Sequence, residues 1–524
     1  MNRMYFLTVS LLSSLYAVAQ VEQPIHALLN ERPAKALAAL RELQSSDPSA
    51  LNNYNLGYAL LLTKNAAEAE QLFAKGIELD PKNPSNYIGK GRVLLLNGKF
   101  EEAKANFDKA IAFNKKDVHV INGVAEAYLT KPERVGQAES LLNDAVKQNI
   151  ANSKTHELKG DAALVKNNGG EAISGYEKAV HLDSKNAEAR RKMGQIYVRT
   201  NNMPLAIENY TQAVADDSLM TLVWKELASY YYLNKKGPEA VAAQKRYIYQ
   251  TEDKKNGTLQ MAFYQFLTRD FAKASYYFDE ANKLGAVFNA TALHYRAIAA
   301  TENKEEAKAI EFFNAYFKME DPKKISSNDY ATYVLLLLRQ SKDSLALDAI
   351  NKSLSIDSSQ SKLKGYKIEI LYKMKRYEEA AQTYEKTMRG RPPKAQDYTF
   401  LGQCYYFLER YDKADEYFQK LVQIAPDEAN SYLWEARTKA SLDPDTKQGL
   451  AKEYYDKILT LENSSTEKGK KNMLEAYQYL TNYYYEAKNK PEVIKVCQKR
   501  LEIDPNDENA KAVLKALKTP SKPK

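Results

Sequence analysis

Small and large apolar residues recur along the first half of the chain with a period of 34 residues. An alanine returns at steps of 34, with a single step of 35: Ala69, Ala103, Ala138, Ala172, Ala206, Ala240 and Ala274. Another small residue stands twelve positions before each alanine, and thirteen positions in one case: Gly57, Gly91, Ala125, Gly160, Gly194, Ala228 and Ala262. Four positions after each alanine stands a residue that is mostly large: Phe73, Phe107, Leu142, Tyr176, Tyr210, Gln244 and Phe278. This self-similarity is typical of a repeat protein.

The pattern predicts two packed α-helices in each repeat. Residues four positions apart lie on one helical face, and a small residue on each helix lets the two backbones approach closely. A single helix pair cannot bury its own apolar side, so each repeat is stabilised by its neighbours. The chain is 44% hydrophobic and 27% charged, and no segment alternates strictly as a half-buried strand does. We therefore expect an all-α solenoid that forms one elongated array.

Further residue types recur at fixed positions of the repeats. In an early repeat Leu56-Gly57 precede Ala69, Phe73 and Asp80-Pro81. A later repeat carries the set Tyr398, Leu401-Gly402, Tyr405, Ala414, Phe418 and Pro426. The last full repeat keeps Leu480, Tyr484 and Asp504-Pro505 but has Val493 and Cys497 where Ala and Phe are usual. In these residues the chain resembles tetratricopeptide repeat proteins, which are built from 34-residue helix-turn-helix units. The resemblance implies a right-handed superhelical solenoid of about 13 such repeats between roughly residues 34 and 505.

The regularity of the repeats suggests a division of the chain. We expect N-terminal repeats over residues 20–250, degenerate repeats over 251–360, C-terminal repeats with a capping helix over 361–518, and a basic tail at 519–524. From about 285 to 360 clear glycine partners are missing and the alanine spacing stretches to 35 and 37, which predicts local irregularity. A step of 37 from Ala414 to Ala451 predicts a lengthened turn at Asp443-Pro444-Asp445.

The first residues are typical of a secretory signal. Arg3 precedes an apolar stretch from Met4 to Leu15, and Ala17-Val18-Ala19 forms a small-x-small cleavage site. Cleavage after Ala19 would leave Gln20 first. The alternatives are a hydrophobic first helix that packs on the solenoid and a membrane anchor, although the apolar stretch is shorter than the ~20 residues that a spanning helix needs. We expect an exported protein of a Gram-negative bacterium, located in the periplasm or associated with the envelope.

The residues that carry chemistry are scattered. The five histidines fall in different repeats and no pair has the i, i+4 spacing of a helical zinc site. No segment fits a phosphate-binding loop, so we expect no enzyme activity, no metal and no cofactor.

Cys404 and Cys497 are the only cysteines, and the repeat register places them two repeats apart. This separation exceeds the ~7 Å between Cα atoms that a disulfide tolerates, so both are predicted to be buried and unpaired.

Two groups of residues are candidates for binding a partner. By analogy with the family, the exposed side of each first helix lines a concave groove. Four of the 38 tyrosines fall on that side: Tyr232, Tyr372, Tyr406 and Tyr485. A mixed charged cluster falls there as well: Glu157, Asp161, Glu188, Arg191, Gln195, Arg199 and Lys225. The tyrosines are explained equally well by packing between repeats, and the charged cluster by an ordinary solvated face. We expect Arg191 and Arg199 to point into open solvent.

The family resemblance also argues against one kind of partner. Repeats that clamp a C-terminal carboxylate use Lys and Asn on one first helix, Asn on the next, and Lys and Arg on the third. The matching positions of this chain are Tyr54, Tyr58, Gly89, Lys154 and Leu158. The formal net charge of +9 is spread along the chain and not clustered as a nucleic-acid interface requires. Weak association of the basic tail with anionic lipid or glycan is compatible with this charge.

The sequence therefore favours a non-enzymatic scaffold of the cell envelope that recognises a peptide or protein partner along the groove. The alternative is an accessory binding protein for carbohydrate or nutrient uptake at the outer membrane. Proteins of that second class usually carry a lipid-modified cysteine and long ligand-binding loops, and this sequence has neither.

Overall fold

A computed structural model of the chain describes residues 25–518. The predicted signal peptide at residues 1–19 and the predicted basic tail at 519–524 lie outside these residues. Packing divides the chain into an N-terminal unit that ends at Met319 and a C-terminal unit that begins at Glu320. The expected divisions near residues 250 and 360, which follow the regularity of the repeats, stay predictions.

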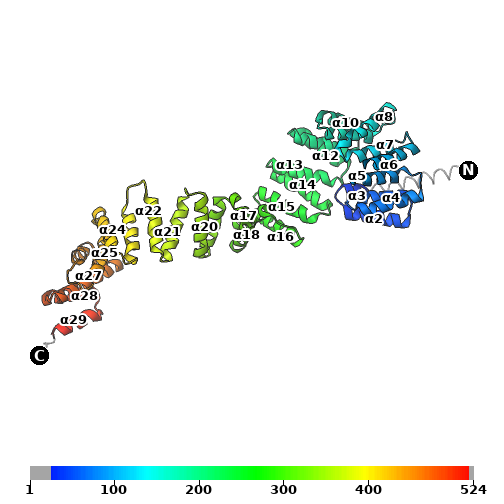
Figure 1. Cartoon of the computed structure of the whole chain (residues 1–524). Helices are drawn as coiled ribbons and strands as arrows, with labels where there is room; N and C mark the ends of the chain where they lie inside the picture. The colour runs from blue at the N-terminus through cyan, green and yellow to red at the C-terminus, as the bar shows by residue number, and fades with distance from the viewer. Residues whose placement is uncertain (1–24, 519–524) are drawn as a thin grey trace. The chain divides into compact units, whose positions relative to one another are not determined.

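Helices follow one another through both units, and no strand occurs in residues 25–518 (Figure 1). After a helical stretch at residues 25–29, the N-terminal unit contains α2 (Pro33–Ser46), α3 (Ala50–Leu62), α4 (Ala66–Leu79), α5 (Pro84–Leu96), α6 (Phe100–Phe113), α7 (Val118–Leu129), the 3-10 helix η1 (Pro132–Arg134), α8 (Val135–Lys147), α9 (Ser153–Val165), α10 (Gly169–Leu182), α11 (Ala187–Arg199), α12 (Met203–Asp216), α13 (Thr221–Leu233), α14 (Gly237–Gln250), α15 (Lys254–Leu267), α16 (Phe271–Lys283), α17 (Ala290–Glu302) and α18 (Glu306–Met319).

The C-terminal unit continues the same alternation. It contains the 3-10 helix η2 (Pro322–Lys324), α19 (Ser327–Arg339), α20 (Asp343–Ile356), α21 (Ser361–Lys373), α22 (Tyr377–Met388), α23 (Ala395–Phe407), α24 (Tyr411–Ile424), α25 (Ala429–Leu442), α26 (Lys452–Leu461), α27 (Glu467–Glu486), α28 (Lys490–Ile503) and α29 (Glu508–Lys518). In the described residues, α3 to α28 form thirteen consecutive pairs, each with an odd-numbered first helix and an even-numbered second helix. The predicted all-α repeat fold is confirmed.

The alanine ladder lies where the two helices of each pair meet. All seven alanines from Ala69 to Ala274 are completely buried, and the residues four positions later are buried beside them. A Cβ atom added to Gly57 would lie 2.6 Å from Cε1 of Phe73, and one added to Gly160 would lie 2.5 Å from Cε1 of Tyr176. In these pairs the small residue on the first helix therefore receives the large ring of the second helix, which confirms the register predicted from the sequence.

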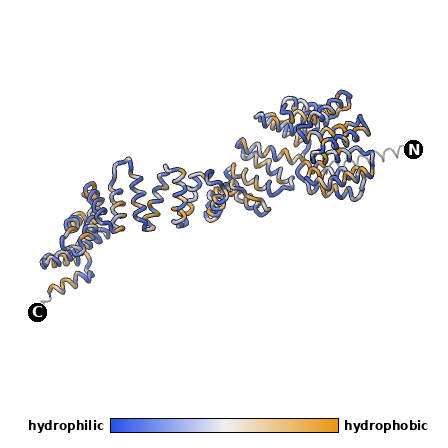
Figure 2. Tube along the Cα trace, in the orientation of Figure 1, coloured by the Kyte–Doolittle hydropathy of each residue, from blue (hydrophilic) through white to orange (hydrophobic). Residues whose placement is uncertain are grey.

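Apolar and polar residues are interspersed along the helices of both units (Figure 2). The buried side chains of successive pairs join into core clusters that run across pair boundaries, as when Phe73 of α4 packs with Leu56 of α3 and Val93 of α5. Each pair thus completes the core of the next, as expected of a solenoid. Cys404 and Cys497 belong to this core: both are buried and free, as predicted.

The turn inside most pairs has a recurrent backbone feature. One residue between the first and the second helix adopts a left-handed conformation, with φ between 55° and 76°, whereas the connection of α7 to α8 contains η1 and has no such residue. Gly98 fills this place once, but most pairs use a residue with a side chain, as at Lys64, Asn167, Asn201 and Lys235. The left-handed region is uncommon for such residues. The packed helices on both sides hold the turn in this conformation.

Departures from regularity occur in the connections. The stretch at 285–360 was expected to be irregular, yet its helices have ordinary lengths and bury Ala309, Phe313, Ala346 and Ile350. Irregularity there is limited to the connections, including the one between α18 and α19, which contains η2.

The predicted long turn after Leu442 is confirmed, since α26 begins only at Lys452. The carboxylate of Asp443 organises this turn by accepting hydrogen bonds from the backbone N–H groups of Gln448 and Gly449 at 3.0 and 2.8 Å.

Candidate partner-binding surface

The predicted charged cluster lies on the first helices of three successive pairs in the N-terminal unit. Glu157 and Asp161 belong to α9, the residues from Glu188 to Arg199 belong to α11, and Lys225 belongs to α13. The structure brings most of these side chains together through residues that the sequence analysis did not single out. The resulting row of ion pairs, which we call the charge ladder, consists of Arg92, Glu126, Lys154, Glu157, Asp161, Glu188, Arg191, Lys192 and Glu226.

The charge ladder links one first helix to the next. Arg92 on α5 binds Glu126 on α7 at 2.6 Å, and Lys154 on α9 lies 3.5 Å from the same carboxylate. Lys154 also binds Glu157 at 2.9 Å. Lys192 on α11 then binds Glu157 at 2.8 Å. Each repeat boundary along this stretch is therefore crossed by at least one ion pair.

Glu157 is the most enclosed carboxylate of the charge ladder, and only 5% of its side chain is exposed. Burial alone would raise its pKa, but the ammonium groups of Lys192 and Lys154 outweigh burial and lower the pKa of Glu157 to about 2. Asp161, next along α9, accepts hydrogen bonds from Lys192 Nζ and from the hydroxyl of Tyr176, both at 2.8 Å. These carboxylates are thus occupied within the chain.

The expected solvent exposure of Arg191 is wrong. Its side chain is only 12% exposed, because the guanidinium lies between Glu188 on its own helix and Glu226 on α13. Both ion pairs measure 2.6 Å. Glu226 also accepts a hydrogen bond from Gln195 Nε2 at 2.7 Å. Arg191 and Gln195 therefore hold two repeats together.

A signal for the charge ladder was present in the sequence. Arg92 and Glu126 are 34 residues apart, and the pairs Glu157–Lys192 and Arg191–Glu226 are each 35 residues apart. Opposite charges separated by one repeat length on first helices are placed to meet across a repeat boundary. Charge pairs at the repeat period thus mark Arg92, Glu126, Lys192 and Glu226 in the sequence itself.

Arg199 and Lys225 differ from the rest of the cluster. Arg199 is exposed, as expected, and has no ion pair within residues 25–518. Lys225 is half exposed and binds Glu31 at 2.5 Å. Together with Gln195 and Glu226 they line a pocket of about 460 Å³ between α11 and α13. These two basic residues are the members of the cluster that remain accessible.

The contact between Lys225 and Glu31 is part of a larger contact that closes the N-terminal unit on itself. Glu31 also accepts a hydrogen bond from the hydroxyl of Tyr247 at 2.6 Å, and His26 binds Asp217. The carboxylate of Glu252 accepts hydrogen bonds from the backbone N–H groups of Ala34 and Lys35 at 2.8 and 2.9 Å. We call this set of contacts the closing contact.

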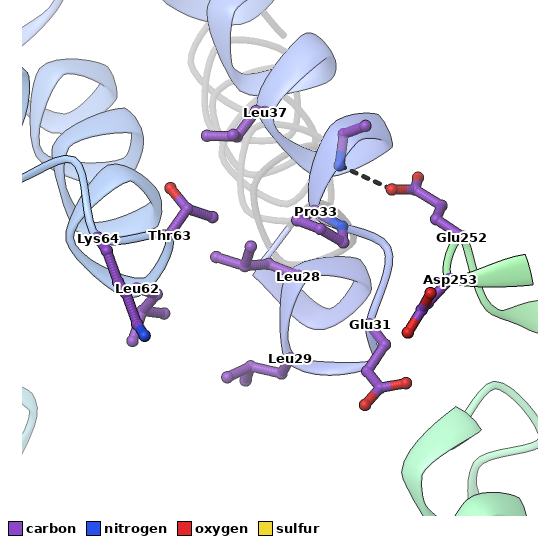
Figure 3. Close-up of a pocket in the computed structure, with 11 residues that line it drawn as sticks. Leu28, Leu29, Glu31, Pro33, Leu37, Leu62, Thr63, Lys64, Glu252 and Asp253 are labelled. Atoms are coloured by element: carbon purple, nitrogen blue, oxygen red, sulfur yellow. Dashed lines mark hydrogen bonds between the residues drawn. The ribbon is translucent and has the colours of Figure 1, made fainter. Parts of the chain in front are cut away.

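The closing contact supplies a cap that the local sequence lacks. Arg32 stands at the N-cap position of α2 and its side chain makes no capping hydrogen bond. Glu252, which lies between α14 and α15, caps the first turn of α2 in its place and sets a negative charge at the helix N-terminus (Figure 3). An apolar pocket of about 920 Å³ lies beside this contact, lined in part by Leu28, Leu29 and Leu62.

The four predicted tyrosines have different surroundings. Tyr232 packs on Tyr264 with ring centroids 5.0 Å apart, and burial raises its pKa to about 12. Tyr372 contacts Phe400, and Tyr406 contacts Trp434. These three rings are partly buried among aromatic neighbours, whereas Tyr485 is 56% exposed and lines a pocket with residues of α29. Of the four, only Tyr485 is a freely accessible ring.

A buried carboxyl group lies apart from the charge ladder, in the C-terminal unit. Glu435 on α25 is completely buried, and neither of its side-chain oxygens has a hydrogen-bond partner of good geometry. Burial and the neighbouring Asp415 carboxyl group of α24 raise the pKa of Glu435 to about 9, and Lys439 opposes them only in part. Lys439 lies closer to Asp415, at 2.7 Å, than to Glu435, at 3.8 Å.

Metal-binding and membrane-spanning features are absent from the described part of the chain. No group of three or more His, Cys, Asp or Glu side chains in residues 25–518 is arranged to hold a metal ion. No helix in the same range has both the length and the apolar character that crossing a bilayer requires.

Comparison with known proteins identifies the repeats. Models of the tetratricopeptide repeat match residues 25–84, 72–105, 191–255 and 398–428. No curated protein matches the chain. Solved structures with similar chains include the C-terminal part of a TPR repeat-containing protein from Cytophaga hutchinsonii, which is 28% identical, with 49% of this chain and 99% of that chain covered and a TM-score of 0.36.

Two further structures are similar over shorter or more divergent stretches. A thermophilic TPR protein from Thermus thermophilus is 20% identical, with 35% of this chain and 99% of that chain covered and a TM-score of 0.31. The pilF protein of Pseudomonas aeruginosa is 18% identical, with 45% and 90% covered and a TM-score of 0.30. The family models identify tetratricopeptide repeats in these segments, and the helix pairs in the rest of residues 25–518 have the same helix-turn-helix architecture.

Proposed function

We propose that the chain is a non-enzymatic scaffold of the cell envelope that binds a peptide or protein partner along the surface of its first helices. The charge ladder is the observation that carries this proposal. Its ion pairs hold five successive first helices, α5 to α13, in fixed register, so the surface beside them is rigid before a partner arrives. A preorganised surface loses less entropy on binding than a mobile one. Solenoids of this kind present extended surfaces suited to recognition.

Location in the envelope rests on the residues before the described range. Arg3, the apolar stretch and Ala17-Val18-Ala19 support export with cleavage after Ala19. We expect the protein purified from its native host to begin at Gln20 or at its cyclised form, as measured by mass spectrometry of the N-terminal peptide. Detection of Met1 or Asn2 at the start of the protein from the host would contradict export.

Site-specific photo-crosslinking in the native host tests the binding surface. A photoreactive amino acid is placed at Leu233 or Tyr485, which are exposed on first helices, and in separate strains at Lys104 or Lys178, which are exposed on second helices. We expect a crosslinked partner from the first-helix positions, recovered in the envelope fraction. Crosslinks that form only from Lys104 and Lys178 would move the surface to the second helices, and no crosslinked protein from any of the four positions would contradict a scaffold role.

A further inference from the structure

The first helices pack less closely in the later part of the N-terminal unit. The backbones of earlier first helices approach the next one closely, as α3 approaches α5 and α5 approaches α7, whereas α11 and α13 are joined mainly by long side chains such as Arg191 and Glu226. The pocket of about 460 Å³ lies in this opening, between the last turns of α11 and most of the length of α13. Its volume is within the range of sites that hold small ligands or a few side chains.

One side of the pocket is apolar. Val198 contributes from α11, and Leu222 and Leu233 contribute from α13. Leu233 is 75% exposed, which is unusual for a leucine in a helix of this array. An aliphatic side chain placed against these three residues would remove them from water, at a gain of roughly 25 cal/mol for each Å² of apolar surface covered.

Two polar atoms of the pocket residues are buried without a partner of good geometry. The hydroxyl of Tyr230, a residue that is only 6% exposed, has no hydrogen bond. Oε2 of Glu226 likewise has no hydrogen-bond partner of good geometry, although Tyr210 also interacts with this carboxylate and its other oxygen binds Arg191 and Gln195. A buried polar group without a hydrogen-bond partner is unfavourable. A ligand with an N–H group and a carbonyl group would satisfy both atoms, and a peptide backbone supplies these together.

The rim of the pocket is basic. Arg199 has no ion pair within residues 25–518, while Glu226 shares the guanidinium of Arg191 with Glu188. Lys225 already binds a carboxylate of the chain itself, that of Glu31, which shows the kind of group that this rim accepts. The rim therefore keeps an unmatched positive charge at Arg199, and an acidic group complements it.

We propose that this pocket binds an extended peptide segment in which an aliphatic residue stands next to an acidic one. The aliphatic side chain packs on Val198, Leu222 and Leu233, and the acidic side chain binds Arg199. A backbone N–H of the peptide donates to Oε2 of Glu226, and the hydroxyl of Tyr230 donates to a peptide carbonyl. This inference rests on the proposed scaffold function and names the kind of segment that one part of the surface recognises.

Selection from a random octapeptide phage library on the full mature chain tests the proposal. We expect enrichment of peptides in which Leu, Ile or Val adjoins Asp or Glu. Selection on the Arg199→Glu variant is expected to enrich Lys or Arg in place of the acidic residue, because the charge preference of the rim is reversed. If selection on the full mature chain enriches no peptide, the proposal is overturned. The same holds if selection on Arg199→Glu still enriches peptides with an acidic residue.

Affinities for one selected peptide separate binding from folding. Tyr230→Phe removes only the unpartnered hydroxyl, so we expect an unchanged or higher Tm together with binding weaker by about fivefold to tenfold, the size of one lost hydrogen bond. Leu233→Asp is expected to weaken binding by at least tenfold, and Lys178→Glu on α10 is the matched control and should leave it unchanged. Unaltered binding in both Tyr230→Phe and Leu233→Asp would contradict this pocket.

Two further outcomes would overturn the proposal in different ways. Equal competition by free leucine and free glutamate would assign the pocket to amino acids and not to peptides. Photo-crosslinks at Tyr485 but not at Leu233 in the host, together with a failed selection, would refute this pocket while the scaffold function stands. If no position forms a crosslink, the proposed scaffold function itself is contradicted.

Discussion

Single residues decide how the stability of this protein depends on pH, and the buried carboxyl group of Glu435 is one of them. Its folded-state pKa of about 9 lies above the usual value of 4.5, so the folded chain keeps a proton that the unfolded chain releases between these two pH values. Stability contributed by this proton is complete below pH 4.5 and is lost as the pH rises toward 9, by up to about 1.4 kcal/mol for each pH unit.

Glu435→Gln should remove this dependence, because the amide has nearly the same shape and cannot ionise. We expect the variant to melt at a higher temperature than the wild type at about pH 8.5, and the difference to shrink steadily toward about pH 4.5, in thermal unfolding followed by circular dichroism. The titratable groups that face Glu435 are Asp415, Lys439, Glu453 and Tyr454, and they stay unchanged in both proteins. A variant that is less stable at both pH values would show that Glu435 is ionised and paired with Lys439.

The left-handed turn residues are a second property of single positions. Lys235 has φ of 58° between α13 and α14, where Gly98 has φ of 76° in an earlier pair. Lys235→Val should destabilise the chain by about 1–2 kcal/mol, since a β-branched residue is strained in this region. Lys235→Gly should be close to neutral. Urea unfolding of the two variants measures the difference, and equal midpoints would show that the turn relaxes to another conformation.

The burial of single residues was predictable where the same packing contact recurs in the repeats. The ion-pair partner of Arg191 was not predicted, because it lies in the next repeat. Ala172 and Tyr176 were placed correctly because the same contact is present in every pair. Arg191 was misplaced because its exposure depends on Glu226 in the next repeat, which is not visible when α11 is considered by itself. The pocket at Arg199 was also invisible in the sequence, because it arises from the wider separation of α11 and α13.

At the scale of helices, the tight contact between the two members of a pair limits side-chain size. Ala172 on α10 is completely buried, and the neighbouring place on α9 is Gly160, where even a Cβ would meet Tyr176. Ala172→Leu should therefore lower stability by about 1–3 kcal/mol through overpacking. Lys178→Ala on the same helix is the control and should change stability by less than about 0.5 kcal/mol. Equal melting temperatures for the two variants would refute the register of the pair.

The existence, order and pairing of the helices could be predicted because independent positions agree on one period. Local exceptions followed from local chemistry: the long turn after Leu442 was expected from Asp443-Pro444-Asp445. The ordinary helix lengths at 285–360 were not expected, since the missing glycine partners and the stretched spacing predicted local irregularity. Ala309 and Ala346 fill the same role on the second helices, and the pairs close without a glycine opposite them.

At the scale of the N-terminal unit, the closing contact joins residues that the repeat pattern keeps far apart. Glu252→Gln weakens the cap of α2 by removing the charge at its first turn. We expect faster hydrogen exchange over residues 33–46 and unchanged exchange over α19 to α28, measured by mass spectrometry. Glu239→Gln, on an exposed position of α14, is the matched control. Unchanged exchange in α2 would mean that the contact carries no stability.

The closing contact also sets an order of assembly. Most contacts in the unit join neighbouring repeats and form as soon as each repeat exists, but Glu31 meets Lys225 across 194 residues and Ala34 meets Glu252 across 218. During synthesis the N-terminal end of the chain emerges first. Glu252 follows α14, so α2 receives its cap only after α14 has been made. Long-range contacts of this kind form slowly because a large loop must close first. Helix α2 of the growing chain therefore becomes fully stable only after the repeats up to α14 have been made.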